Sequence, residues 1–272
     1  MTRRSPTLHR NRGFTLVEAI VVIVITGIVA TFTAVFIRLP VQGYVDTAER
    51  LALADGADTA LGRINRELRL ALPNSVQVSN GGTTLQFVLT KAGGRYVDVN
   101  DAPPPSILPL RFDRTSLQFD IVGPAPAGRA AILPDDLLVI NNTGAAPSHV
   151  YLDNRDNVAQ IAAIAGSRVT LRANNLGTQS PPPYRFRIVA GTVTYDCRNG
   201  RLLRHFTRSI PTPVAPAIGA ANVVANQAQC AFGSVALPTQ AGTELVSLSL
   251  RLSSASGESI ALIRQTQVEN LP

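Results

Sequence analysis

The pattern of apolar and polar positions divides the chain into an unbroken apolar run, an amphipathic stretch and a long region of alternating residues. The apolar run extends from Ala19 to Ile37 and is free of charge until Arg38. As an α-helix it would rise roughly 28 Å, close to the ~30 Å hydrocarbon core of a bilayer. We therefore predict that residues 14–38 form a transmembrane helix.

The amphipathic stretch is expected to continue this helix as a stem. Its apolar residues recur at intervals near three and four, the period of one helix face. They are Val41, Tyr44, Val45, Ala48, Leu51, Ala52, Leu61, Ile64, Leu68 and Ala71. Pro40 is expected at a bend, and Pro73 is expected to end the helix because a residue before proline avoids the helical conformation. The pattern predicts one helix over 14–72, in which residues 39–72 are a stem packed on the domain that follows.

Beyond Pro73 the period changes to two, which is typical of β-strands. Strands are expected at 76–79, 83–89, 117–122, 137–140, 149–152, 158–164, 168–172, 185–189, 192–196, 245–252 and 259–268. Asn80-Gly81-Gly82 and Ala190-Gly191 read as tight turns, and proline-rich stretches such as 103–105 and 181–183 read as loops. The predicted fold class is α+β: a long N-terminal helix packed on a mostly antiparallel β-sheet domain, 73–272, with proline-rich loops.

The charges around the apolar run indicate how it would lie in a membrane. Four arginines precede it, Arg3, Arg4, Arg10 and Arg12, and there is no acid before Glu18. The positive-inside rule places residues 1–13 in the cytoplasm and the chain after Arg38 on the other side of the membrane. These arginines account for four of the seven net positive charges, so the basic balance gives little support for nucleic-acid binding, and we predict no nucleic-acid partner.

Three interpretations of the opening segment compete. A cleaved secretory signal would have a shorter apolar core, and a plain signal anchor would leave the residues just before the core unexplained. The string Gly13-Phe14-Thr15-Leu16-Val17-Glu18 resembles the leader junction of type IV prepilins and type II secretion pseudopilins. The resemblance implies cleavage between Gly13 and Phe14 and methylation of the new N-terminus at Phe14. It also implies that Glu18 contacts the N-terminal ammonium of a neighbouring subunit.

The same resemblance implies partners and a location. The partners are a prepilin peptidase and methylase and other minor and major pilin-like subunits. The location is the bacterial inner membrane, crossed once, with a cytoplasmic N-terminus and a periplasmic C-terminal domain that enters a pilus or pseudopilus. A second interpretation of Glu18 stays open, because Thr15 and Glu18 also match a helix capping box, which needs no partner subunit.

Shorter stretches in the rest of the chain indicate which type of pilin-like protein the sequence resembles most. The stem end, 64–75, is similar to that of larger minor pseudopilins. The stretches 186–189, 193–197, 200–204 and 267–272 together resemble the MshO type of mannose-sensitive haemagglutinin (MSHA) pilus biogenesis proteins. The implied function is assembly or initiation of such a pilus or of a type II secretion pseudopilus. A signal-anchored extracytoplasmic binding module and a pilus-tip adhesin are the alternatives, although the family's leading tip subunit lacks a carboxylate at the Glu18 position.

The two cysteines, Cys197 and Cys230, are expected to form one disulfide, because an isolated pair in an exported domain meets an oxidising compartment. Two separate buried thiols are the alternative. No histidine lies near either cysteine, so the pair does not predict a zinc site.

Residues that carry catalysis are not evident in the sequence. No nucleophile elbow, phosphate-binding loop or dinucleotide motif is present, and we predict no enzyme activity, no cofactor and no metal. His149 beside Tyr151 is expected to be a half-buried pair on a strand. Asp135-Asp136 and the stretch 154–157 are expected to form turns in preference to calcium loops.

Overall fold

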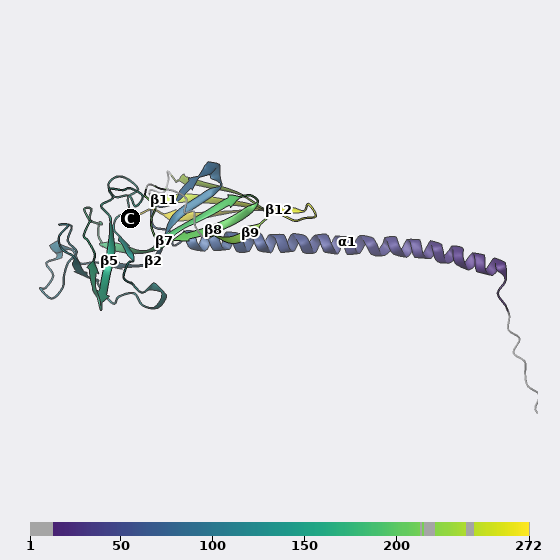
Figure 1. The fold of residues 1–272 in the computed structure, drawn as a ribbon, viewed down its shortest axis with the longest axis horizontal. Coiled ribbons are helices and arrows are strands. Elements are labelled where there is room, and N and C mark those ends of the chain that lie inside the picture. Colours follow the sequence, from purple (N-terminus) through teal and green to yellow (C-terminus); the bar gives the residue numbers. More distant parts are fainter. Residues whose placement is uncertain (1–12, 213, 215–220, 238–241, 272) are drawn as a thin grey trace, which may run out of the picture. The chain divides into compact units, whose positions relative to one another are not determined.

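The computed structural model describes residues 13–212, 214, 221–237 and 242–271. It divides the chain into two units, Met1–Leu51 and Ala52–Pro272, and helix α1 (Leu16–Leu68) contributes to both. The second unit consists of the last part of this helix and the strands β1 to β12, which pair antiparallel throughout (Figure 1). The predicted α+β class is confirmed.

Helix α1 is long and apolar enough to cross a membrane. Its most apolar window has a mean hydropathy of 2.8, and none of that window is buried. Pro40 lies inside the helix, which continues through it.

The helix is shorter at both ends than the predicted range of 14–72. It begins at Leu16 because Thr15 caps it. It ends at Leu68 because the following residues leave the helix to pair with β2 (Thr84–Arg95): the amide of Leu72 donates to Val88 at 2.8 Å. Extended pairing therefore replaces the last predicted helical turn.

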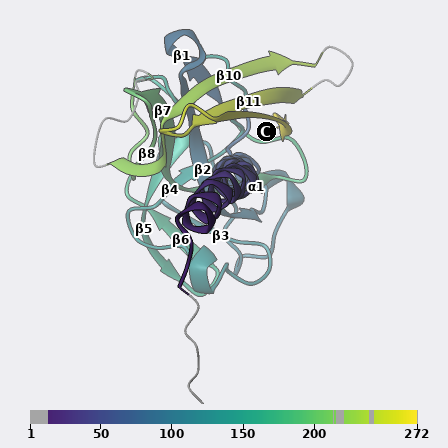
Figure 2. The ribbon, with the colours of Figure 1, turned by 90° about the vertical axis from the view of Figure 1, so that its right-hand side faces the viewer.

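The strands form a nine-stranded and a three-stranded sheet. The large sheet follows the order β1-β2-β7-β4-β5-β6-β3, and β8 extends it from β7 to β9. The small sheet has the order β10-β11-β12. Figure 2 shows β10 and β11 side by side, apart from β5 and β6. The bounds are β1 Gln77–Ser79, β3 Gln118–Asp120, β4 Leu137–Val139, β5 Val158–Ala165, β6 Arg168–Leu171, β7 Arg185–Arg198, β8 Arg201–Thr207, β9 Ala221–Asn226, β10 Ala228–Ala236, β11 Thr243–Ser253 and β12 Ser259–Glu269, with 3-10 turns η1 Asn80–Gly82, η2 Val99–Asp101 and η3 Gly128–Ala130.

The predicted turn at Ala190-Gly191 is wrong, because β7 runs through it without a break. Leu89 of β2 lies opposite Gly191 and Thr90 lies opposite Val189, so Ala190 is bulged out of the ladder. Gly191 has φ +151°, and a Cβ there would lie 2.1 Å from the carbonyl oxygen of Thr207. This glycine permits a close approach of β8, one of the roles that glycine has inside strands.

The predicted strand at 149–152 is also wrong. This segment is a turn, in which the amide of Leu152 donates to the carbonyl of His149 at 3.1 Å. Val150 is buried and its amide donates to the side chain of Asn142 at 3.0 Å, so the backbone is satisfied without a neighbouring strand. Val150 and Tyr151 are both buried, and consecutive buried residues occur in a turn that packs inward as well as in a strand.

Strands β8, β9 and β10 were not predicted. Strands β9 and β10 contain several alanines, and β9 two asparagines, residue types that are depleted in strands, and β8 contains no valine or isoleucine. Their strand conformation comes from pairing with neighbours.

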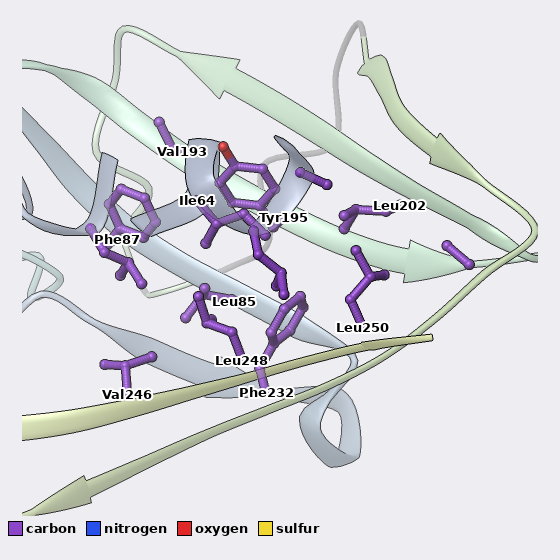
Figure 3. Close-up of a cluster of buried hydrophobic side chains, with 14 of the residues drawn as sticks. Ile64, Leu85, Phe87, Val193, Tyr195, Leu202, Phe232, Val246, Leu248 and Leu250 are labelled. Atoms are coloured by element: carbon purple, nitrogen blue, oxygen red, sulfur yellow. The ribbon is translucent and has the colours of Figure 1, made fainter. Parts of the chain in front are cut away.

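The main hydrophobic core lies between the last part of α1 and the two sheets. Figure 3 shows Ile64 of the helix among side chains of β2, β7 and β8 from the large sheet and of β10 and β11 from the small one. The labelled residues are Ile64, Leu85, Phe87, Val193, Tyr195, Leu202, Phe232, Val246, Leu248 and Leu250. A second core around Phe119 and Phe186 fills the far part of the large sheet.

Candidate functional site

The candidate site begins at the Gly13–Phe14 peptide bond, which precedes the helix. Both residues are exposed, and Phe14 has 81% of its surface accessible. Nothing lies within 4 Å of the position that a Cβ on Gly13 would occupy. The bond is therefore accessible to a peptidase in the described part of the chain, while residues 1–12 of the predicted leader lie outside the described residues.

Thr15 and Glu18 form the start of the helix. The amide of Glu18 donates to the hydroxyl of Thr15 at 3.2 Å, and the amide of Ala19 donates to the Thr15 carbonyl at 3.2 Å. This is the first half of a capping box. The second half, a bond from the Thr15 amide to the Glu18 carboxylate, is not formed. Among the described residues, no hydrogen bond or ion pair occupies the Glu18 carboxylate, so its charge is available to another molecule.

The helix surface that follows is apolar on every side. Each large apolar side chain from Phe14 to Ile37 has between 48% and 81% of its surface exposed. An uncovered apolar surface of this extent is unfavourable in water and requires lipid or other helices around it. Together with the hydropathy of the helix, it indicates a membrane-anchored protein.

The predicted stem divides into an exposed part and a buried part. Val41, Tyr44, Val45 and Leu51 are between 49% and 77% exposed. From Ala57 onward the stripe is buried: Ala57, Ala60, Leu61, Ile64 and Leu68 have at most 2% of their surface exposed. The packing that the sequence predicted for the whole stem is therefore found only in its last part.

An ion-pair cluster joins the last turn of the helix to the large sheet. Glu67 accepts a bond from the Tyr195 hydroxyl at 2.9 Å and lies 3.0 Å from the Arg204 guanidinium. Burial, followed by the negative charge of Glu67, raises the pKa of Tyr195 above its ordinary value. The sequence pattern gave no signal that Glu67 pairs with β8.

The stem end, 64–75, and the C-terminal stretch, 267–272, meet in space. The amide of Asn74, just after the stem, donates to the side chain of Asn270 at 2.8 Å. The Asn74 side-chain amide donates to the carbonyls of Asn142 at 2.6 Å and Asn270 at 2.9 Å. In return, Asn142 donates to the carbonyl of Pro73 at 2.6 Å. The stem end and the C-terminal stretch thus form one hydrogen-bonded clasp, a structural role for both.

Cys197 of β7 and Cys230 of β10 form a disulfide with a Cα–Cα distance of 5.9 Å. The expected pairing is present. It links the two sheets on one side of the core, a connection that the spacing in the sequence did not reveal.

The residues considered for chemistry have structural partners. Asp135 pairs with Arg172, and Asp136 lies 2.6 Å from Lys91. The rings of His149 and Tyr151 lie 5.5 Å apart, in the turn already described. No group of three or more histidine, cysteine, aspartate or glutamate residues is placed to bind a metal in the part of the chain that the structure describes.

Comparison with known proteins adds one match. Neither curated proteins nor solved structures give a match to this chain. Residues 8–34 match the family model described as the prokaryotic N-terminal methylation motif. The matched segment contains Gly13, Phe14 and Glu18 and extends into the apolar helix. The chain therefore carries a prepilin-like methylation motif on a membrane-anchoring helix, which supports a type IV pilin-like protein.

Proposed function

We propose that this protein is a minor pilin-like subunit that takes part in the assembly or initiation of a type IV pilus or a type II secretion pseudopilus. The observation that carries the proposal is the methylation motif at residues 8–34, with an accessible Gly13–Phe14 bond and an unoccupied carboxylate at Glu18. The MshO type of MSHA pilus protein is the subfamily that we favour, on the short stretches near the C-terminus. The proposed role of this protein is structural and not catalytic.

Processing is the first step of the proposed function. A prepilin peptidase cuts after Gly13 in the inner membrane and releases the cytoplasmic leader. Methylation of Phe14 then leaves a secondary ammonium, which keeps its positive charge. The single-pass helix holds the second unit in the periplasm, as the arginines of the leader predict.

Assembly is proposed to depend on the contact between Glu18 of one subunit and the Phe14 ammonium of its neighbour. An unpaired carboxylate within the membrane costs on the order of 2–3 kcal/mol on insertion scales. Removing one partner of a desolvated pair leaves an uncompensated charge, so subunits shifted along the filament axis are disfavoured. The apolar helix surfaces supply the remaining contact, and the Glu18 pair selects the axial register.

The first experiment tests processing. The intact mass of the N-terminal peptide from the membrane-isolated protein should correspond to a chain that begins at N-methylated Phe14. A leader still attached in the whole membrane pool would instead support a signal-anchored binding module that works alone.

The second experiment separates pairing from capping. Glu18→Gln removes the charge but keeps the backbone amide that donates to the Thr15 hydroxyl, so the cap seen at the helix start is retained. Thr15→Ala is the matched control, because it removes the cap, at a cost of about 1 kcal/mol, and keeps the charge. Crosslinking to partner subunits is compared at equal levels of processed protein. We expect Glu18→Gln to lose assembly and Thr15→Ala to retain it. Normal assembly of Glu18→Gln would disprove the proposed pairing.

A further inference from the structure

A groove of about 950 Å³ lies at the β12 side of the small sheet, within the second unit, and residues of both β11 and β12 line it. Five consecutive residues of β12, 265–269, line it. Successive side chains of a strand point to opposite faces, so a groove that meets five in a row includes the free edge of β12. Thr243 and Leu245 of β11 also line the groove, which therefore extends over one face of the small sheet as well. The segment 68–71, at the end of the helix, forms part of the opposite wall.

The backbone along this edge is open. Strand β12 pairs with β11 alone, and among the described residues no other segment receives or donates a backbone hydrogen bond along it. Exposed edges of this kind are templates for pairing with another chain.

Two other edge strands, β9 and β10, are protected in ways that β12 is not. The edge strand β9 is short and has a register shift opposite Leu202 and Leu203. The free side of β10 is covered by η1, where a Cβ on Gly82 would lie 2.9 Å from the carbonyl of Phe232. Strand β12 has 11 residues in unbroken register and contains no proline or lysine, two residues that commonly protect edges. Its one basic residue, Arg264, is held by Asp58 at 2.7 Å.

The charge in the groove is mainly positive. Arg69 and Arg187 line it, and Arg187 also lines an adjoining crevice together with Arg185. None of these three guanidinium groups has a hydrogen bond or ion pair with another residue in the described ranges. Glu269 is the only acid among the described residues that line the groove.

We propose that this groove binds an extended acidic segment of a partner polypeptide. The segment adds to β12 through main-chain hydrogen bonds, and its carboxylates lie against Arg69 and Arg187. Acidic residues at alternate positions meet the arginines, because alternate side chains of a strand share one face. The described lining contains no aromatic ring on which a nucleobase would stack, which favours a peptide over a nucleic acid. This inference does not depend on processing of the N-terminus.

The test uses the full chain purified in detergent and a fluorescent synthetic peptide that alternates glutamate with valine. Anisotropy at low salt should show saturable binding. A peptide with glutamine in place of glutamate tests charge, and a peptide with alternate N-methylated amides tests main-chain pairing. A single-stranded oligonucleotide of equal charge tests general affinity for polyanions. We expect both altered peptides to bind at least ten-fold more weakly than the parent.

Variants then locate the site. Arg69→Gln and Arg187→Gln should each weaken binding of the acidic peptide by about ten-fold, equivalent to ~1.4 kcal/mol. Arg251→Gln is the matched control, since Arg251 is exposed on β11 and lies outside the groove. Each variant is first checked for an unchanged circular dichroism spectrum. Any one of four results would overturn the proposal. The acidic peptide does not bind, or the N-methylated peptide binds as tightly as the acidic peptide. The oligonucleotide binds more tightly than the acidic peptide, or all three arginine variants change the affinity equally.

Discussion

The substitution Ile64→Asp tests whether the last part of α1 is integral to the domain or only tethers it. The Ile64 side chain is completely buried and lies in the core cluster with Leu85 and Phe87 of β2. Removal of a buried isoleucine costs about 2–5 kcal/mol. Placing a carboxyl group there without a partner adds roughly 2 kcal/mol or more. The total exceeds about 4 kcal/mol, a large part of the ~5–15 kcal/mol that holds a typical domain together.

Thr59→Asp is the matched control, because Thr59 is exposed in the same helix and the substitution introduces the same charge. It should change the free energy of unfolding by no more than about 0.5 kcal/mol. Ile64→Val, at about 0.5–1.5 kcal/mol, gives a folded variant if Ile64→Asp does not accumulate. For a unit of this size, ~1 kcal/mol lowers the melting temperature by about 2–4 °C.

The assay is thermal unfolding of the full chain, followed by the near-ultraviolet circular dichroism of its tyrosines. The chain has five tyrosines and no tryptophan, and Tyr44 alone lies outside the second unit. The signal therefore reports mainly on that unit. The expected order of melting temperatures is wild type and Thr59→Asp together, then Ile64→Val, then Ile64→Asp. Equal melting temperatures for Thr59→Asp and Ile64→Asp would refute the packing of the helix on the sheets.

Three further predictions follow from the second unit. Replacing Cys197 and Cys230 by serine should lower its stability by roughly 3–4 kcal/mol on the chain-entropy model, and unchanged melting after reduction of the wild type would contradict this. Asn74→Gly keeps the positive φ of 57° but removes the side-chain hydrogen bonds of the clasp, so it should lower the melting temperature. Asn270→Ala removes the acceptor of the Asn74 amide and should also lower it. Unchanged melting temperatures for both variants would show that the clasp does not stabilise the unit. Burial raises the pKa of Tyr96 to about 12 from about 10, so the folded state keeps a proton that the unfolded state releases. The contribution of Tyr96 to stability should be constant below pH ~10 and fall as the pH rises toward ~12, and Tyr96→Phe should reduce the slope of stability against pH in this range, measured by denaturant titrations at each pH.

Local patterns predicted the helix and several strands because their signals lie in adjacent residues. The unbroken apolar run predicts a membrane helix whatever surrounds it, and Thr15 is a cap by residue type and position. The hairpin around Asn80 and the closing pair, β11 and β12, were also predictable. In each, two alternating segments flank a short turn, so pairing partners are neighbours in the sequence.

Other features had no local signal. Ala190-Gly191 has the composition of a turn, and only the close approach of β8 makes Gly191 part of a strand. The partner of Glu67 is 137 residues away, and that of Asn74 is 196 residues away. Neither pairing has a signature within a window of the sequence, because the side chains involved are also common on surfaces and in turns.

The sequence alone therefore determined the N-terminal motif, the membrane helix and the α+β class, since each depends on the order of residues along a short segment. Tertiary structure decided how much of the stem is buried: the fully buried residues of the stem begin at Ala57, where the helix packs in the core shared with both sheets. It also placed the disulfide between the sheets and brought Arg69 and Arg187 to the open edge of β12. These features arise where distant segments pack together, and the free energy that selects them comes from the burial of a core shared by α1 and both sheets.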